Sequence, residues 1–264
     1  MTLKIGTRKS PLAMAQAGEV RASLIEVWPD LTVELVPIVT SGDKFSDKPL
    51  IDIGGKGLFT KEIEEALLAK HIDIAVHSMK DMPTQLPDGL IIGCMLERED
   101  PRDMLVGKGI TSLDDLPKGA VFGTSSLRRA AQMKMRRPDI KVVPLRGNVQ
   151  TRLTKLEKGE IRATMLAKAG LNRLDLHDVP GILLSADDFL PAVAQGAIGV
   201  ECRVGDEKML ELLSPLADID TENAVLCERA FLSVLDGSCK TPIAGYASLE
   251  GKELRFRGLI SNIP

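Results

Sequence analysis

Aromatic residues are scarce in this chain of 264 residues: one tryptophan, one tyrosine and six phenylalanines make up 3% of it. Proteins that bind single-stranded nucleic acid stack the bases on aromatic rings, so this composition argues against such a platform. The formal net charge is only −3, which leaves no global field that would attract nucleic acid or an anionic membrane. Any bound anion must therefore be held by locally placed arginines.

Cysteine pairs and long apolar runs are also missing. The four cysteines, Cys94, Cys202, Cys227 and Cys239, are far apart, with no CxxC pair and no nearby histidine ligands. This spacing excludes a standard zinc motif and argues against a disulfide scaffold. The N-terminus lacks the apolar region of a signal peptide, and no apolar run is long enough to span a bilayer. We therefore expect a cytoplasmic protein with reduced thiols.

The sequence does contain a regular alternation of strand-like and helix-like patterns. Hydrophobic residues make up 44% and charged residues 27% of the chain, a composition typical of an aliphatic α/β core. Short apolar runs alternate with helical patterns along most of the length, which predicts helices packed on a mostly parallel sheet. Ser10-Pro11 predicts a helix start, and another helix is expected over residues 126–136. Residues 215–220 have the pattern of a linker, and residues 244–249 and 254–260 that of a hairpin turning at Glu250-Gly251. A charged stretch with a proline, residues 97–103, indicates a hinge or domain boundary, and residues 40–57 have the composition of a lid loop.

Residues 72–83, IDIAVHSMKDMP, are the predicted working centre of the chain. The apolar residues 72–76 have strand character, and His77, Ser78, Lys80 and Asp81 follow in one turn. Ligands of open α/β sheets bind at the carboxyl ends of strands, which is where these side chains fall. The alternative is a solvated turn whose charges face water, and spacing alone does not decide between the two.

Arginines and hydroxyl side chains follow other predicted strands in the same way, and we call this set the anion rim. Arg128 and Arg129 oppose the dipole of the helix that they begin, and a bound anion would explain them. A guanidinium can donate two parallel hydrogen bonds to a carboxylate, so the set indicates a ligand with several carboxylates or phosphates. Any single member could instead pair with a surface acid. The rim consists of Arg8, Ser10, Ser78, Lys80, Thr124, Ser126, Arg128, Arg129, Arg146, Arg152 and Arg173.

Cys239 differs from the other cysteines because it lies in a Gly-Ser loop beside Lys240. Exposure and a lysine neighbour can lower a thiol pKa and favour the nucleophilic thiolate. No base lies at local spacing, so a Cys/His protease mechanism is not indicated. A buried, inert thiol is the alternative reading of the same residue.

A series of motifs occurs in order along almost the whole chain: GTRKSPLAMAQA (6–17), VTSGD (39–43), GGKGLFTKE (54–62), DIAVHSMKDMP (73–83), EREDPRDML (97–105), GTSSLRRAAQ (123–132), LRGNVQTRL (145–153), LPAVAQGAIGVECR (190–203) and ERAFLSVLDGSCKTPIA (228–244). In these motifs the chain resembles the porphobilinogen deaminase family over essentially its whole length. One departure is Ala194-Gln195-Gly196, which stands where the family usually has Gly-Gln-Gly.

The resemblance implies a transferase of tetrapyrrole and haem biosynthesis. It would join four porphobilinogen molecules head to tail, with loss of ammonia, into the linear tetrapyrrole hydroxymethylbilane. The primer would be a dipyrromethane cofactor held by a thioether to Cys239. The implied α/β fold has two periplasmic-binding-protein-like domains, residues 1–96 with 197–214 and residues 102–190. A small α+β domain, residues 219–264, would carry the cysteine and ends short of the family's pattern.

The resemblance also assigns roles by motif. Asp81 matches the catalytic carboxylate, which would stabilise positive charge on pyrrole rings and transfer protons. The cofactor would be bound by Ser78, Lys80, Asp81, Thr124, Ser126, Arg128, Arg129 and Arg146, and the substrate by Arg8, Ser10, Arg152 and Arg173.

We expect a monomer with no metal and no nucleic-acid or membrane partner. Two other hypotheses remain. One is a non-enzymatic two-lobed protein that binds polycarboxylates, and the other is a Schiff-base enzyme at Lys80.

Overall fold

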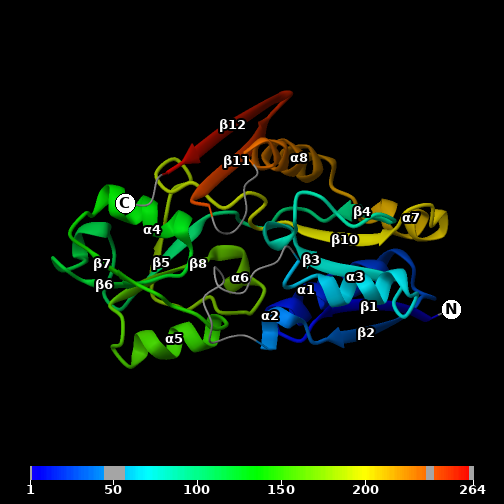
Figure 1. Ribbon diagram of the computed structural model, residues 1–264, viewed down its shortest axis with the longest axis horizontal. Helices are drawn as coiled ribbons and strands as arrows, with labels where there is room; N and C mark the ends of the chain where they lie inside the picture. Colours follow the sequence, from blue (N-terminus) through cyan, green and yellow to red (C-terminus); the bar gives the residue numbers. More distant parts are fainter. Residues whose placement is uncertain (1, 45–56, 236–240, 262–264) are drawn as a thin grey trace. The chain divides into compact units, whose positions relative to one another are not determined.

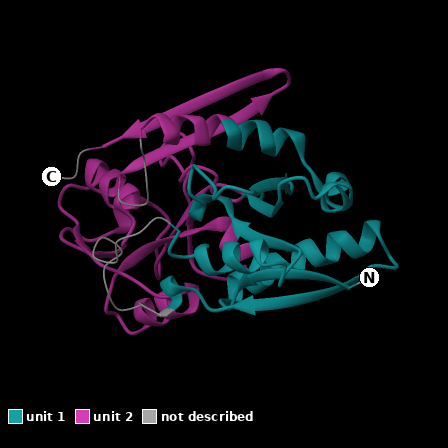
Figure 2. Ribbon diagram, turned by 45° about the vertical axis from the view of Figure 1, so that its right-hand side comes forward, with its two compact units in different colours: residues 1–99, 197–226 teal, residues 100–196, 227–264 magenta. Residues whose placement is uncertain are grey.

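The computed structural model describes residues 2–44, 57–235 and 241–261. It divides into two compact units, residues 1–99 with 197–226 and residues 100–196 with 227–264 (Figure 2). The first boundary falls inside the charged stretch 97–103. The division into three domains, with residues 219–264 as a separate one, stays a prediction.

Unit 1 is built on a five-stranded sheet in the order β2-β1-β3-β10-β4 (Figure 1). β1 is parallel to β2 and β3, whereas β10 is antiparallel to β3 and β4. The strands are β1 (Thr2–Arg8), β2 (Thr32–Ile38), β3 (Ile74–Ser78), β10 (Ile198–Arg203) and β4 (Leu90–Met95).

Helices cover both faces of this sheet, and each face has its own apolar core. On one face, α1 (Pro11–Val27) and α7 (Glu207–Leu213) share a core with residues such as Ile5 and Val76. On the other, α3 (Lys61–Leu68) packs on Ile72 and Ala75. Two short segments, α2 (Ser41–Lys44) and the 3-10 turn η1 (Met79–Asp81), follow β2 and β3.

Unit 2 repeats the same topology with the strand order β7-β6-β8-β5-β9. β6 is parallel to β7 and β8, and β5 is antiparallel to β8 and β9. α4 covers one face, around Phe122 and Met133, and α5 and α6 cover the other, around Leu153 and Leu171. The elements are β5 (Asp103–Val106), β6 (Val121–Gly123), β7 (Lys141–Val143), β8 (Ala163–Ala167), β9 (Gly181–Leu183), α4 (Leu127–Arg136), α5 (Val149–Glu157), α6 (Lys168–Asn172) and the 3-10 turn η2 (Leu113–Asp115).

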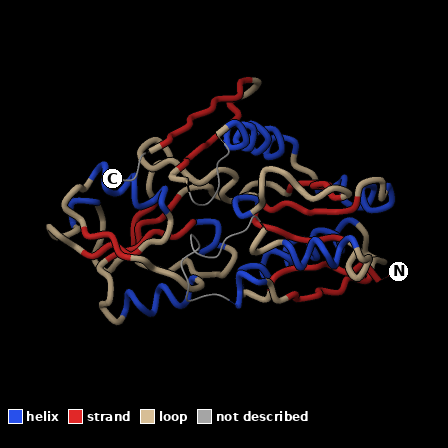
Figure 3. The backbone as a smooth tube through the Cα atoms, viewed as in Figure 1, coloured by secondary structure: helices blue, strands red, loops and turns tan. Residues whose placement is uncertain are grey.

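The last part of the chain forms a helix and a hairpin (Figure 3). After the 3-10 turn η3 (Ser214–Leu216), α8 runs from Ile219 to Val234. β11 (Ile243–Glu250) and β12 (Glu253–Ile260) form the antiparallel hairpin, as the sequence predicts. Phe231 of α8 packs on Phe256 of β12, with ring centroids 5.0 Å apart.

The α/β class is confirmed. Four strands of each sheet run in the same direction and one, β10 or β5, runs antiparallel between two of them, so the sheets are mostly parallel as predicted. Two details are corrected. Residues 215–220 do not form a linker, since they belong to η3 and the start of α8. His77 does not lie in the turn, because β3 continues to Ser78 and buries it. No helix in the described ranges is long and apolar enough to cross a membrane.

Candidate active site

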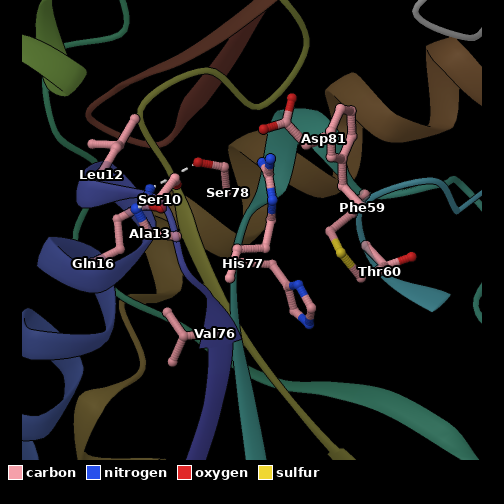
Figure 4. A pocket seen from close by; sticks show the side chains of 12 residues that line it. Ser10, Leu12, Ala13, Gln16, Phe59, Thr60, Val76, His77, Ser78 and Asp81 are labelled. Atoms are coloured by element: carbon pink, nitrogen blue, oxygen red, sulfur yellow. Dashed lines mark hydrogen bonds between the residues drawn. The ribbon is translucent and has the colours of Figure 1, made fainter. Parts of the chain in front are cut away.

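A cavity in unit 1 lies at the carboxyl ends of β1 and β3 (Figure 4). In this view Asp81 and Phe59 stand at one end of the cavity, and Ser10 and Ser78 at the other. Its lining combines donors, one carboxylate and an aromatic ring, which suits an anionic ligand that also has an apolar ring. The lining residues are Arg8, Ser10, Leu12, Ala13, Gln16, Phe59, Thr60, Val76, His77, Ser78, Asp81 and Met82.

Local structure explains how Asp81 reaches this cavity. β3 ends at Ser78, and the 3-10 turn that follows is anchored by Met79, whose side chain is 1% exposed. The backbone N–H of Met79 donates to the carbonyl of Ala197 at 3.0 Å. Met79 also lies against Gly199, where an added Cβ would come within 2.1 Å of its sulfur. With Met79 fixed inside, Lys80 is half-buried and Asp81 is exposed.

Ser10 and Gln16 are positioned by the first helix. The Ser10 hydroxyl accepts from the N–H of Ala13 at 3.3 Å, and Pro11 begins α1, which confirms the predicted helix start. Gln16 is buried, and its Nε2 donates to the Ser78 hydroxyl at 2.8 Å. Gln16 is not among the residues predicted from the sequence. It could have been found as a polar residue on the buried face of α1, which also contains Ala13 and Ala17.

Arg8 already has an internal carboxylate partner. Its guanidinium forms an ion pair with Asp43 and lies over the ring of Phe59, with 4.2 Å between the Cζ atom and the ring centroid. Burial by itself would raise the pKa of Asp43. Hydrogen bonds from Arg8 and Thr40, together with the charge of Arg8, outweigh burial and lower that pKa below its ordinary value.

A buried group of ionisable side chains lies beneath the cavity. The Nε2 atom of His77 is 3.0 Å from Glu201, whose side chain is fully buried. Glu64 of α3 is also buried nearby, and burial is the main cause that raises its pKa. Repulsion from Glu201 adds to that rise, while Thr60 and His77 oppose it. His77 therefore faces the internal acid Glu201 and does not belong to the polar turn that the sequence predicts.

Hydroxyl groups mark the corresponding strand end in unit 2. The Ser126 side chain caps α4 by accepting from the N–H of Arg129 at 3.4 Å. The N–H of Ser126 in turn donates to the Thr124 hydroxyl at 3.1 Å. Thr124 and Ser126 thus lie together at the N-terminus of α4, as the sequence predicts.

Arg128 and Arg129 are buried and share one carboxylate, Asp103. Arg128 Nη2 lies 2.8 Å and Arg129 Nη2 2.7 Å from it, and Gln195 donates to it at 2.9 Å. Burial would raise the pKa of Asp103, but the two arginines and their hydrogen bonds hold it well below its usual range. Other donors of these arginines go to the carbonyls of Leu190 and Met165. An internal acid therefore accounts for arginines that the sequence analysis explains by a bound anion.

The remaining arginines of the rim lie at the ends of unit 2 elements. Arg146 follows β7 and is half-buried. Arg152, in the first turn of α5, donates from its Nε to the carbonyl of Gly147 at 3.0 Å. Arg173 caps the C-terminus of α6.

The cysteines fall into two groups. Cys94 and Cys202 are buried, and burial raises the pKa of their thiols to about 12 and about 11. Cys227 is half-buried, and burial raises its thiol pKa as well. All three are poor nucleophiles at neutral pH.

Cys239, the residue predicted to hold the cofactor, lies outside the described residues, as do residues 45–56 of the predicted lid. In the described part of the chain, no group of three or more acidic, histidine or cysteine side chains is arranged to hold a metal.

Comparisons with known proteins point to one family. The model for "Porphobilinogen deaminase, dipyromethane cofactor binding domain" matches residues 3–211. The model for "Porphobilinogen deaminase, C-terminal domain" matches residues 222–263. A curated relative, the chloroplastic porphobilinogen deaminase of Oryza sativa subsp. japonica, is 55% identical over 265 residues, which cover 98% of this chain and 74% of the relative.

Two solved structures match this chain with lower similarity. A nutrient-binding protein from Burkholderia cenocepacia, bound to methionine, matches with a TM-score of 0.49 and 15% identity, covering 80% of this chain and 90% of its own. The periplasmic VFT2 domain of BvgS from Bordetella pertussis matches with a TM-score of 0.47 and 13% identity, covering 87% of this chain and 92% of its own.

Proposed function

This chain belongs to the porphobilinogen deaminase family, and from that premise we propose which of its residues carry the reaction. The family matches make it a transferase that joins four porphobilinogen molecules into the linear tetrapyrrole hydroxymethylbilane, with a dipyrromethane cofactor. They give no support to the alternative of a non-enzymatic polycarboxylate-binding protein.

Asp81 is the proposed catalytic carboxylate. In each addition a C–N bond breaks at the aminomethyl carbon of porphobilinogen, and a C–C bond forms there to the free α-carbon of the growing chain. Ammonia leaves, and the proton released from the attacking α-carbon must be carried away. Asp81 can accept that proton and supply one to the departing amine. Its negative charge also stabilises the positive charge that develops on the pyrrole rings, an effect of about 3–4 kcal/mol for one such group.

The position of Asp81 is the observation that carries this assignment. Its side chain is exposed at the cavity, yet its turn is fixed by the buried Met79. A rigid mount matters because electrostatic stabilisation needs a charge that is already in place. Beside it, Lys80 is proposed to bind a carboxylate rather than form a Schiff base.

The donors around Asp81 suit the acetate and propionate groups of porphobilinogen. The Nε atom of Arg8 is buried without a hydrogen-bond partner among the described residues, so this guanidinium has a donor to spare. The hydroxyls of Ser10 and Ser78 line the same cavity. The residues proposed for the substrate are Arg8, Ser10, Arg152 and Arg173. Those proposed for the cofactor are Ser78, Lys80, Thr124, Ser126, Arg128, Arg129 and Arg146.

Arg128 and Arg129 can bind the cofactor only if they do so while they are also paired with Asp103. Because Asp103 occupies both guanidinium groups, a cofactor carboxylate must share them with that acid. Thr124 and Ser126, at the N-terminus of α4, face no such competition from Asp103 in the described contacts.

The cofactor, when bound, supplies the primer on which the chain grows, and Cys239 is proposed to hold it by a thioether. Cys94, Cys202 and Cys227 make poor alternatives, since burial raises the pKa of each thiol. A monomer in the cytoplasm with reduced thiols completes the proposal, although the rice relative is named as chloroplastic.

Intact-mass measurement and turnover assays test the assignments together. We expect the wild type to carry an adduct of dipyrrole size, and Cys239→Ala to lack it. Asp81→Asn should keep the adduct but lose at least about a hundredfold in turnover, as loss of one such electrostatic group does elsewhere. Asp88→Asn, which changes another exposed carboxylate of unit 1, serves as the matched control and should match wild type. An unmodified yet fully active wild type would contradict the cofactor site, and an active Asp81→Asn would contradict the catalytic role.

A further inference from the structure

The partner of Arg8 is a carboxylate of the chain itself, although the cavity is built to bind carboxylates. Asp43 lies in α2, 35 residues away from Arg8 in the sequence. Its two oxygens are divided between partners: Oδ1 faces Arg8, and Oδ2 accepts from the Thr40 hydroxyl at 2.8 Å and the Thr40 N–H at 3.2 Å. Arg8 therefore engages only one of the two oxygens.

This ion pair is open enough to exchange. The side chains of Arg8 and Asp43 are 26% and 23% exposed, and a pair that is in part open to solvent is weaker than an enclosed one. The Thr40 contacts of Asp43 use the oxygen that does not face Arg8, so they do not depend on the ion pair. The pair around Asp103 is different, because that acid is completely buried and receives Arg128, Arg129 and Gln195.

Phe59 fixes which edge of Arg8 can receive a ligand. The guanidinium lies over its ring, and Gly42 lies so close to the ring that an added Cβ would come within 2.2 Å of it. The Nε edge of Arg8 is buried and unpartnered among the described residues, while its Nη2 faces Asp43. A second carboxylate on this guanidinium therefore either displaces Asp43 or binds next to its negative charge.

We propose that Asp43 is an internal substitute for a substrate carboxylate on Arg8, which porphobilinogen must displace or tolerate when it binds. This inference rests on the proposed role of Arg8 in substrate binding. Asp43 lowers the apparent affinity for porphobilinogen, because Arg8 can receive a substrate carboxylate only in the fraction of molecules in which it is not paired with Asp43. In return, it holds the guanidinium in place over Phe59 while the cavity lacks substrate.

The test is a variant that gains affinity. Asp43→Asn keeps an oxygen for Thr40 but removes the charge that opposes a substrate carboxylate. We expect the KM for porphobilinogen to fall by about two- to fivefold, the range that follows from a weak exposed ion pair. We expect kcat to stay within about twofold of wild type, because the change acts on binding alone. Added acetate, a simple carboxylate, should also inhibit the variant at lower concentrations than the wild type.

A matched control separates this role from anchoring of α2. Glu62 accepts from the Ser41 N–H at 2.8 Å, so it anchors the same segment through a contact other than the Arg8–Asp43 ion pair. Glu62→Gln should not lower KM, and a fall equal to that of Asp43→Asn would overturn the proposal. A KM that is unchanged or raised in Asp43→Asn would overturn it as well, because Asp43 would then only position Arg8.

Arg8→Met distinguishes this proposal from the one it rests on. A raised KM in that variant supports Arg8 as a carboxylate ligand, and the result for Asp43→Asn then decides the role of Asp43 alone. An unchanged KM in Arg8→Met removes both the role of Arg8 and that of Asp43. The transferase function itself would stand in that case, since the variant still turns over substrate.

Discussion

Replacing Asp103 with asparagine should strongly destabilise unit 2. The substitution keeps the shape of the side chain but leaves the guanidinium groups of Arg128 and Arg129 buried without an anion. Breaking a buried ion pair from one side costs about 3–5 kcal/mol, and here one carboxylate serves two cations, so we expect about 4–5 kcal/mol. With an m value of about 3 kcal/mol/M, the urea midpoint should fall by about 1.3–1.7 M.

Asp187→Asn is the matched control for Asp103→Asn. Asp187 also pairs with an arginine of unit 2, Arg257, but its side chain is 83% exposed. An exposed ion pair contributes at most about 1 kcal/mol, so the control should unfold close to the wild type. If Asp103→Asn shifts the midpoint no more than this control, the two buried arginines do not depend on Asp103 and the reasoning is wrong.

The pH dependence of the same variant has a definite sign. The pKa of Asp103 is lower in the folded chain than its ordinary value of 3.8. Its contribution to stability is therefore fully present above the unfolded value and is lost as the pH falls through the folded value. The difference between wild type and Asp103→Asn should be constant near neutral pH and shrink only below about pH 3.8. A difference that already shrinks between pH 7 and 5 would contradict this cause.

Two further substitutions should stabilise the protein. Ala194 has a φ of 59°, and the left-handed conformation costs an L-residue about 1–2 kcal/mol. Ala194→Gly should therefore raise the free energy of unfolding by about 0.5–1 kcal/mol, once the entropy cost of glycine is subtracted. Urea unfolding measures this change, and a lower urea midpoint would contradict the prediction. Burial is the main cause that raises the pKa of Glu64 above its ordinary 4.5, so its ionisation on going to higher pH destabilises the fold. Glu64→Gln should be more stable than wild type at pH 7 and equal to it below about pH 4.5, and a variant that is less stable at pH 7 would refute the sign.

The sequence predicts local elements well where their signals are local. α4 begins at Leu127 after the predicted serine cap, and the hairpin turns close to the predicted Glu250-Gly251. β10 and β5 are different, because each inserts antiparallel between strands that are distant in the chain. Alternation of strand and helix along the sequence carries no signal of that pairing.

His77 shows the same limit at the scale of one residue. In the sequence it stands among polar residues after an apolar run, which favours a turn. In the structure it is the buried fourth residue of β3, and its partner Glu201 is 124 residues away. A polar side chain is stable in a buried strand only when another polar group meets it there. Reading the neighbours of His77 in the sequence cannot reveal that partner.

The anion rim stays a prediction, because the sequence cannot distinguish an internal anion from a ligand. An arginine that follows a strand gives the same pattern in both cases, since Asp43 and Asp103 are 35 and 26 residues from Arg8 and Arg129. What separates the two is how each acid is held. Asp103 is enclosed and receives several donors, so a ligand would have to share its arginines. Asp43 is partly exposed and gives Arg8 one oxygen, so a substrate carboxylate can take its place. We therefore propose that, among the rim arginines, Arg8 is the one at which binding of porphobilinogen and the internal charge of the protein compete directly.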